Sequence, residues 1–176
     1  MMRRGVVWVT GLSGSGKSTV TARLRERLIE AGVEPVVLDG DRLRAIMPVR
    51  LGYDEADRRR LAMFYARLAH EFAAQGRLVL CSTISLFHEV HAWNRANNEN
   101  YLEVWLRVPV RELSARDGRA ALYSGGAAVG AGVAAEFPEA PHVVIDNHGP
   151  TTPDDAADRI MAALAGAPVP APARGR

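Results

Sequence analysis

The sequence holds a single cysteine and no long apolar run that is free of charge. Cys81 has no partner for an internal disulfide, which fits a reducing cytosol, so we expect a cytoplasmic protein. No stretch is long enough to span a membrane, and no membrane partner is expected. Arg3 and Arg4 precede only five apolar residues, which is too short a segment for a signal peptide.

The sequence also has little excess of one sign of charge over the other. The formal net charge is +2, the isoelectric point is about 9.0, and no block of like charges exceeds residues 58–60. This mild basic bias suits a small anionic ligand and does not call for a nucleic-acid polymer as partner. The length of 176 residues suits one domain, which we place over residues 1–164. We expect the Ala/Pro-rich residues 165–176 to be disordered.

A phosphate-binding motif is present near the start of the chain. Residues 11–18 spell G-x-x-x-x-G-K-S between an apolar, β-branched run and a helical pattern. Glycines let the backbone approach an anion, and Lys17 adds a charge near the β- and γ-phosphates of a nucleotide. The Ser18 hydroxyl is placed to bind Mg²⁺, so the expected cofactors are ATP and Mg²⁺. The residues expected to bind the nucleotide are Gly11, Ser13, Gly14, Ser15, Gly16, Lys17, Ser18 and Thr19. The alternative is a chance Gly/Ser-rich turn.

Strand-like and helix-like patterns alternate along the chain. We predict strands over residues 6–10, 33–38, 78–81, 102–108 and 142–146. We predict helices over residues 17–31, 54–74, 87–98, 110–117 and 153–164. Residues 118–141 are rich in Gly and Ala and suit a mobile loop. The alternation predicts a three-layer α/β fold, a five-stranded parallel sheet with helices on both faces.

Two carboxylates follow the second predicted strand. Ligands of open parallel sheets bind at the carboxyl ends of strands, where Gly11, Asp39 and Ser82 all lie. One of Asp39 and Asp41 can hold Mg²⁺, and the other can orient or deprotonate an acceptor hydroxyl. The sequence does not decide which residue has which role. The alternative is an acidic turn in which Asp41 caps a helix.

Two motifs of other nucleotide-binding classes are missing. The third strand runs into Ser82 and Thr83 without a carboxylate, which weakens the motor-ATPase and GTPase interpretations. The guanine-binding motif Asn-Lys-x-Asp is also absent. Both absences favour a small-molecule kinase. A nucleotide-binding regulatory module without an acceptor is the alternative from another class.

Three arginines are candidates for binding anionic groups. Arg44 and Arg58 could each clamp an anionic substrate, or they could be solvated surface residues. Arg116 precedes the Gly-rich stretch, so it could neutralise charge as a lid closes, or form a structural ion pair. His88 and His91 are too sparse a set for zinc, and we expect them at the surface or near the substrate.

Several short motifs, in order, resemble adenylylsulfate (APS) kinase. They are residues 11–19, Leu38-Asp39-Gly40-Asp41 with Arg44, Leu51-Gly52-Tyr53 with Asp57-Arg58, Ile84-Ser85, Val108-Pro109, Ala115-Arg116-Asp117 and Leu122-Tyr123. The resemblance covers roughly residues 5–147 and implies a P-loop kinase fold, a lid at about residues 117–137, and phosphoryl transfer from ATP to a nucleotide-like acceptor. We expect Lys17, Asp39, Asp41 and Arg116 to be catalytic and Ser18 and Asp39 to bind the metal; the resemblance places Arg116 on the lid arginine near the ATP. Family members are often dimers, so a homodimer is possible.

The residues expected at the acceptor match the family motifs in part and depart from them in part. We expect Asp41, Arg44, Arg58, Thr83, Ile84 and Ser85 to bind the acceptor; the resemblance places Arg44 and Arg58 on acceptor-binding positions and Ser85 on a serine that bacterial members phosphorylate. However, Leu61, Met63 and Phe64 stand where the family has Asn-x-Arg-Arg, Thr83 replaces a Phe that packs on adenine, and Leu86-Phe87-His88 replaces Pro-Tyr-Arg. Losing several charge-assisted contacts, each worth about 1.5–3 kcal/mol, would make APS a poor substrate. Residues 82–95 are more similar to relatives that phosphorylate another nucleotide, such as a cytidine diphosphoramidate. The remaining alternative is an authentic APS kinase.

Overall fold

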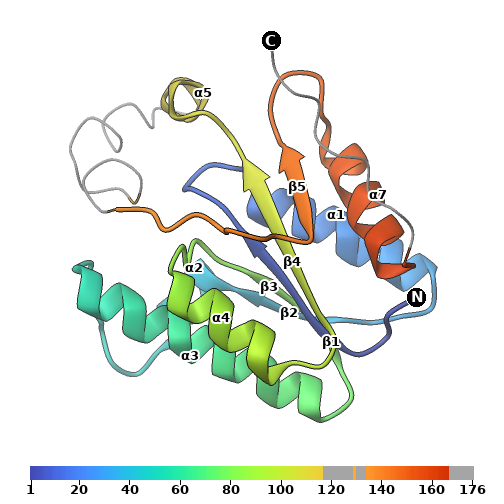
Figure 1. Ribbon diagram of the computed structural model, residues 1–176, viewed down its shortest axis with the longest axis horizontal. Coiled ribbons are helices and arrows are strands. Elements are labelled where there is room, and N and C mark those ends of the chain that lie inside the picture. The colour runs from blue at the N-terminus through green and yellow to red at the C-terminus, as the bar shows by residue number, and fades with distance from the viewer. Residues whose placement is uncertain (117–128, 130–133, 167–176) are drawn as a thin grey trace.

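A five-stranded parallel sheet forms the centre of the computed structural model, which describes residues 1–116, 129 and 134–166 (Figure 1). The strands run in the order β2-β3-β1-β4-β5, and each neighbouring pair is parallel. Their bounds are β1 Gly5–Thr10, β2 Val36–Asp39, β3 Leu78–Ser82, β4 Tyr101–Arg107 and β5 Val143–Asp146. This arrangement confirms the predicted three-layer α/β fold.

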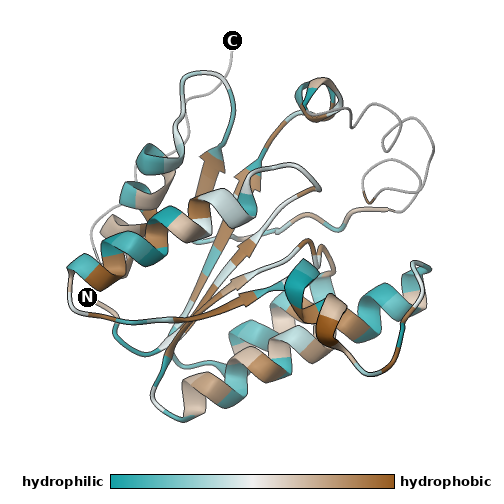
Figure 2. Ribbon diagram, turned by 180° about the vertical axis from the view of Figure 1, so that it is seen from behind, coloured by the Kyte–Doolittle hydropathy of each residue, from teal (hydrophilic) through white to brown (hydrophobic). Residues whose placement is uncertain are grey.

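Helices cover both faces of the sheet, so its central strands are buried and apolar on both sides (Figures 1 and 2). Val7 and Val9 of β1 pack with α1 and α7, whereas Val6 and Trp8 pack with α3. The helix bounds are α1 Lys17–Glu30, α2 Gly40–Ile46, α3 Glu55–Ala74, α4 His88–Asn97, α5 Val110–Ala115 and α7 Pro153–Leu164.

The register of the sheet brings three strand ends together. Ser82, at the end of β3, lies opposite Val9 of β1 and also opposite Asp39 of β2. Because these strands are parallel, the segments that follow them leave the same edge of the sheet. The predicted gathering of Gly11, Asp39 and Ser82 at one edge is therefore confirmed.

Helix starts follow local capping chemistry, and one of them corrects a prediction. Asp54 caps α3 by accepting a hydrogen bond from the backbone N–H of Asp57 at 2.8 Å. The cap of α2 is Asp39, which accepts from the backbone N–H groups of Asp41 and Arg42 at 3.1 and 3.2 Å. The alternative in which Asp41 is the cap was wrong, because α2 begins at Gly40 and Asp41 already lies in its first turn.

Two other boundaries differ from the sequence prediction. The second strand begins at Val36 instead of Val33, because the N–H of Val33 bonds to the carbonyl of Leu28 and extends the end of α1. Residues 134–141 of the predicted mobile loop are held in part by Glu136, which contacts Arg59 and the backbone N–H of His88. Most of the predicted lid and residues 167–176 of the predicted tail lie outside the described residues. No helix in the described part of the chain combines the length and the apolar character needed to cross a membrane.

Candidate active site

The loop between β1 and α1 forms a cradle at the amino end of a 14-residue helix. Gly16, at the N-cap of α1, has a φ of 89°, in the left-handed region that favours glycine. Lys17 reaches back across the loop, and its Nζ donates to the carbonyl oxygens of Gly11 at 3.0 Å and Leu12 at 2.8 Å. The helix N-terminus and Lys17 together give this loop the positive potential that an anion requires.

The loop lines one end of a cavity of about 450 Å³. The predicted nucleotide-binding residues that line it are Ser13, Gly14, Gly16, Lys17, Ser18 and Thr19. Gly11 and Ser15 are buried behind the loop instead. A Cβ at Gly11 would lie 2.6 Å from the carbonyl oxygen of Leu106 and 2.7 Å from Ser15 Oγ, so this position has room only for glycine.

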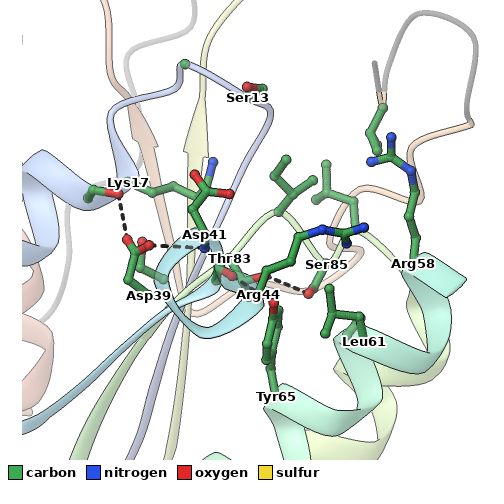
Figure 3. A pocket seen from close by; sticks show the side chains of 18 of the residues that line it. Ser13, Lys17, Asp39, Asp41, Arg44, Arg58, Leu61, Tyr65, Thr83 and Ser85 are labelled. Atoms are coloured by element: carbon green, nitrogen blue, oxygen red, sulfur yellow. Dashed lines mark hydrogen bonds between the residues drawn. The ribbon is translucent and has the colours of Figure 1, made fainter. Parts of the chain in front are cut away.

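Ser18 and Asp39 form the pair of oxygen ligands that the sequence predicts for a metal (Figure 3). Ser18 Oγ donates to Asp39 Oδ2 at 2.8 Å, while Asp39 Oδ1 accepts from the start of α2. A hydroxyl and one carboxylate suit Mg²⁺, which proteins hold with one or two carboxylates together with substrate phosphates. Within the described residues, no group of three or more His, Cys, Asp or Glu side chains could hold a metal by itself. The residues present therefore fit a magnesium ion that a nucleotide brings with it.

The far end of the cavity carries the two predicted arginine clamps. Arg44 donates to the carbonyl oxygens of Leu51 and Gly52 at 2.6 and 2.5 Å, and its guanidinium lies 4.1 Å from the centre of the Tyr53 ring. Arg58 donates to the carbonyl of Tyr53 at 2.6 Å. Burial, and then the charge of Arg44, lower the pKa of Arg58. Both arginines line the cavity and are held by the loop 51–53 (Figure 3).

Thr83, Ile84 and Ser85 form the wall between β3 and α4. Thr83 Oγ1 and Ser85 Oγ lie 2.8 Å apart, and the hydroxyl of Thr10 donates to the carbonyl of Ile84. Ser85 has a φ of 27°, which is unusual for a residue other than glycine. His91 Nε2 lies 3.1 Å from the Ser85 carbonyl oxygen. All three predicted residues line the same cavity as the phosphate-binding loop.

His91 corrects the expectation of a surface or substrate-side histidine, because its side chain is only 5% exposed. Burial lowers the pKa of His91 to about 4, against about 6.5 in an unfolded chain. The unfolded state therefore takes up the proton first as the pH falls. The stability that neutral His91 contributes is present above pH 6.5 and is lost between pH 6.5 and about 4.

We expect this loss to be measurable in urea unfolding experiments. Between pH 7 and pH 4.5 the free energy of unfolding should fall, with a contribution from His91 on the order of 3 kcal/mol in total. His91→Gln removes the titrating group, so its unfolding free energy should depend less steeply on pH over this interval. An identical pH dependence in the two proteins would contradict the buried, neutral state of His91.

Arg116 lies against the phosphate-binding loop, and its catalytic role stays a prediction. Its two terminal nitrogens donate to the carbonyl oxygens of Gly14 at 3.0 Å and Asn147 at 2.9 Å. The sequence analysis missed Asn147, although it follows directly after β5 and the rule about strand ends applies to it. It also missed Tyr65, which lines the cavity and donates to the carbonyl of Gly40 at 2.7 Å. In the sequence, Tyr65 is recognisable only as part of the apolar face of its predicted helix.

A family model described as adenylylsulphate kinase matches residues 3–146 of this chain. The chain belongs to the adenylylsulphate kinase family.

Within this family, two curated relatives differ in the substrate that their names give. A cytidine diphosphoramidate kinase of Campylobacter jejuni is 38% identical over 112 residues, which cover 64% of this chain and 65% of that protein. An adenylyl-sulfate kinase of Paraburkholderia xenovorans is 39% identical over 118 residues, 66% of each protein. The matched part of the chain thus spans slightly less than two thirds of the length of both relatives.

Solved structures of family members share the architecture. The APS kinase CysC of Mycobacterium tuberculosis, in complex with AMPPNP and APS, superposes with a TM-score of 0.76 at 30% identity, covering 95% of this chain and all of that one. A hexameric APS kinase from Thiobacillus denitrificans has a TM-score of 0.68 at 26% identity, covering 93% of this chain and 29% of that one. Shikimate kinase from Aquifex aeolicus, at 16% identity and a TM-score of 0.62, shares the fold. For this chain, a homodimer stays a prediction.

Proposed function

We propose that this protein is an ATP- and Mg²⁺-dependent kinase that transfers the γ-phosphate of ATP to a nucleotide-like acceptor other than APS. The observation that supports it most is the cavity of about 450 Å³, which is lined by Lys17 and Ser18 at one end and by Arg44 and Arg58 at the other. A phosphate donor and an anionic acceptor can therefore meet in one cavity. Phosphoryl transfer depends chiefly on such positioning and on charge neutralisation.

The donor is held by the loop between β1 and α1. Backbone N–H groups at the start of α1 and the ammonium of Lys17 bind the phosphates of ATP. Ser18 and Asp39 hold Mg²⁺, which supplies positive charge to the phosphate oxygens. Arg116, already bound to the carbonyl of Gly14, lies where it can neutralise charge that develops during transfer.

The two aspartates then take different roles. Both oxygens of Asp39 are engaged, by Ser18 on one side and by the backbone of α2 on the other, which suits a metal-binding residue. Asp41 is in the first turn of α2 and lines the cavity. We assign to Asp41 the role of orienting or deprotonating the acceptor hydroxyl.

The lining of the acceptor end argues against APS. Leu61, Leu86 and Phe87 line this end, together with the small polar Thr83. Leu61 stands where the APS kinase motifs have Asn, and Thr83 where they have Phe. Met63 and Phe64, where those motifs have two arginines, do not line the cavity, so neither position supplies a charge to the acceptor. A pocket that leaves the charge of a ligand unpaired rejects that ligand strongly. The name of the Campylobacter jejuni relative makes a cytidine diphosphoramidate the first acceptor to test.

Transfer of the label from γ-labelled ATP distinguishes the possible acceptors. We expect label to enter a cytidine diphosphoramidate or a related nucleotide, with a kcat/KM at least about tenfold above that for APS, as the loss of one contact to a charged group predicts. Saturation at micromolar APS with a similar or higher kcat/KM would show an authentic APS kinase instead. Label appearing only in inorganic phosphate, whatever metabolite is added, would contradict the kinase proposal and favour a regulatory nucleotide-binding module.

A further inference from the structure

Asn147 connects the edge strand of the sheet to the phosphate-binding loop. It follows β5 directly, and its backbone N–H donates to the carbonyl of Arg107 at 3.0 Å. The preceding residue, Asp146, accepts two hydrogen bonds from the guanidinium of Arg107, at 2.5 and 2.9 Å. The backbone of Asn147 is thus fixed from β4, and the residue is 8% exposed.

The side chain of Asn147 is directed at the loop. Its amide nitrogen donates to the carbonyl oxygen of Ser15 at 2.7 Å, across 132 positions of sequence. A Cβ added to Gly16 would lie 2.5 Å from the same amide nitrogen, so the contact requires glycine at that position. A hydrogen bond and a close packing contact therefore join Asn147 to two successive loop residues.

Arg116 completes this connection. One of its terminal nitrogens donates to the carbonyl of Gly14, and the other donates to the backbone carbonyl of Asn147. The side-chain amide of Asn147 therefore holds the loop, and the backbone carbonyl of Asn147 holds Arg116. Two residues from distant parts of the chain, Arg116 and Asn147, thus fix two successive carbonyl groups of the loop, those of Gly14 and Ser15.

Fixing a carbonyl also fixes the N–H group that follows it. A trans peptide is planar, and its C=O and the next N–H point in opposite directions. We propose that Asn147 is a positioning residue for nucleotide binding, which turns the Ser15 carbonyl away from the ligand and so directs the N–H of Gly16 toward the phosphates. The ligand class is a nucleoside di- or triphosphate, because it must carry a phosphate at the amino end of α1.

The test is the Kd of the Mg²⁺ complex of AMPPNP, measured by calorimetry on the full chain. Asn147→Ala should raise this Kd at least about tenfold, because an unrestrained loop must order itself when the nucleotide binds. Asn147→Ser, whose hydroxyl is too short to reach the Ser15 carbonyl, should show a similar loss and provides a second variant if the alanine variant does not fold.

Asn98 offers a matched control. It is 7% exposed, and its amide nitrogen also donates to a backbone carbonyl, that of Asn94, at 2.9 Å. Asn98→Ala should lower the melting temperature as Asn147→Ala does, yet keep the Kd for AMPPNP within about twofold of the wild-type value.

The outcomes separate this inference from the proposed function on which it rests. A wild-type chain that does not bind AMPPNP overturns both. A wild-type chain that binds AMPPNP, while the folded Asn147 variants bind it within twofold or lose no more affinity than Asn98→Ala, overturns the positioning role alone.

Discussion

Lys17→Ala should reduce phosphoryl transfer by about 10³-fold and weaken ATP binding, while leaving the fold intact. Lys17 Nζ donates to the backbone carbonyls of Gly11 and Leu12, and its side chain lines the cavity at the amino end of α1. Its main contribution is therefore a positive charge delivered to the phosphates. The measurement is label transfer from γ-labelled ATP to the best acceptor, together with the melting temperature of each protein.

A control on the same helix separates this effect from a general loss of charge. Arg25 is an exposed cation of α1 that pairs with Glu34 at 3.6 Å and does not line the cavity. Arg25→Ala removes the same charge, and its rate should stay within about twofold of wild type because exposed ion pairs contribute little. If Lys17→Ala were as active as Arg25→Ala, the loop would have no part in catalysis.

Asp39→Asn should reduce the rate by about 10²–10³-fold and raise the Mg²⁺ concentration needed for half-maximal activity. The carboxylate of Asp39 is 2.8 Å from Ser18 Oγ and supplies the only charged group of the proposed metal pair. Asparagine caps helices as well as aspartate does, so α2 should keep its start and the protein its stability. Binding of Mn²⁺, followed by electron paramagnetic resonance in the presence of AMPPNP, reports on the metal independently of activity.

Asp54→Asn is the matched control for this change. Asp54 caps α3 in the same manner as Asp39 caps α2, but it does not line the cavity. Its substitution should leave both the rate and Mn²⁺ binding unchanged. Equal Mn²⁺ affinities in the Asp39→Asn and Asp54→Asn proteins would exclude Asp39 from the metal site.

The parts of the site that could be predicted from the sequence are those that follow strand ends. The motif around Lys17 predicts the backbone conformation of the loop, because glycines occur where the loop turns and the helix begins directly after it. Asp39 was placed beside this loop because parallel strands end at one edge of the sheet, and the register of Asp39, Ser82 and Val9 bears this out.

The contacts that could not be predicted from the sequence are those between a side chain and a distant backbone carbonyl. Arg116 and Asn147 bind carbonyl oxygens of Gly14 and Ser15, and every residue carries such a carbonyl, so no side-chain pattern marks the partner. The same holds for Arg44, whose guanidinium is held by the carbonyls of the loop 51–53. The burial of His91 could not be predicted either, since a histidine on an amphipathic helix can face the core or the solvent.

The most direct measurement of the central claim uses the fact that Lys17 is the only lysine in the sequence. An amine-reactive acylating reagent can therefore modify Lys17 and the N-terminal amine alone, and mass spectrometry resolves the two sites. If the loop grips the triphosphate, MgATP should slow the acylation of Lys17 at least about tenfold, since a bound ligand excludes the reagent, while the N-terminal amine reacts at its usual rate. Equal acylation of Lys17 with and without saturating MgATP would contradict the account.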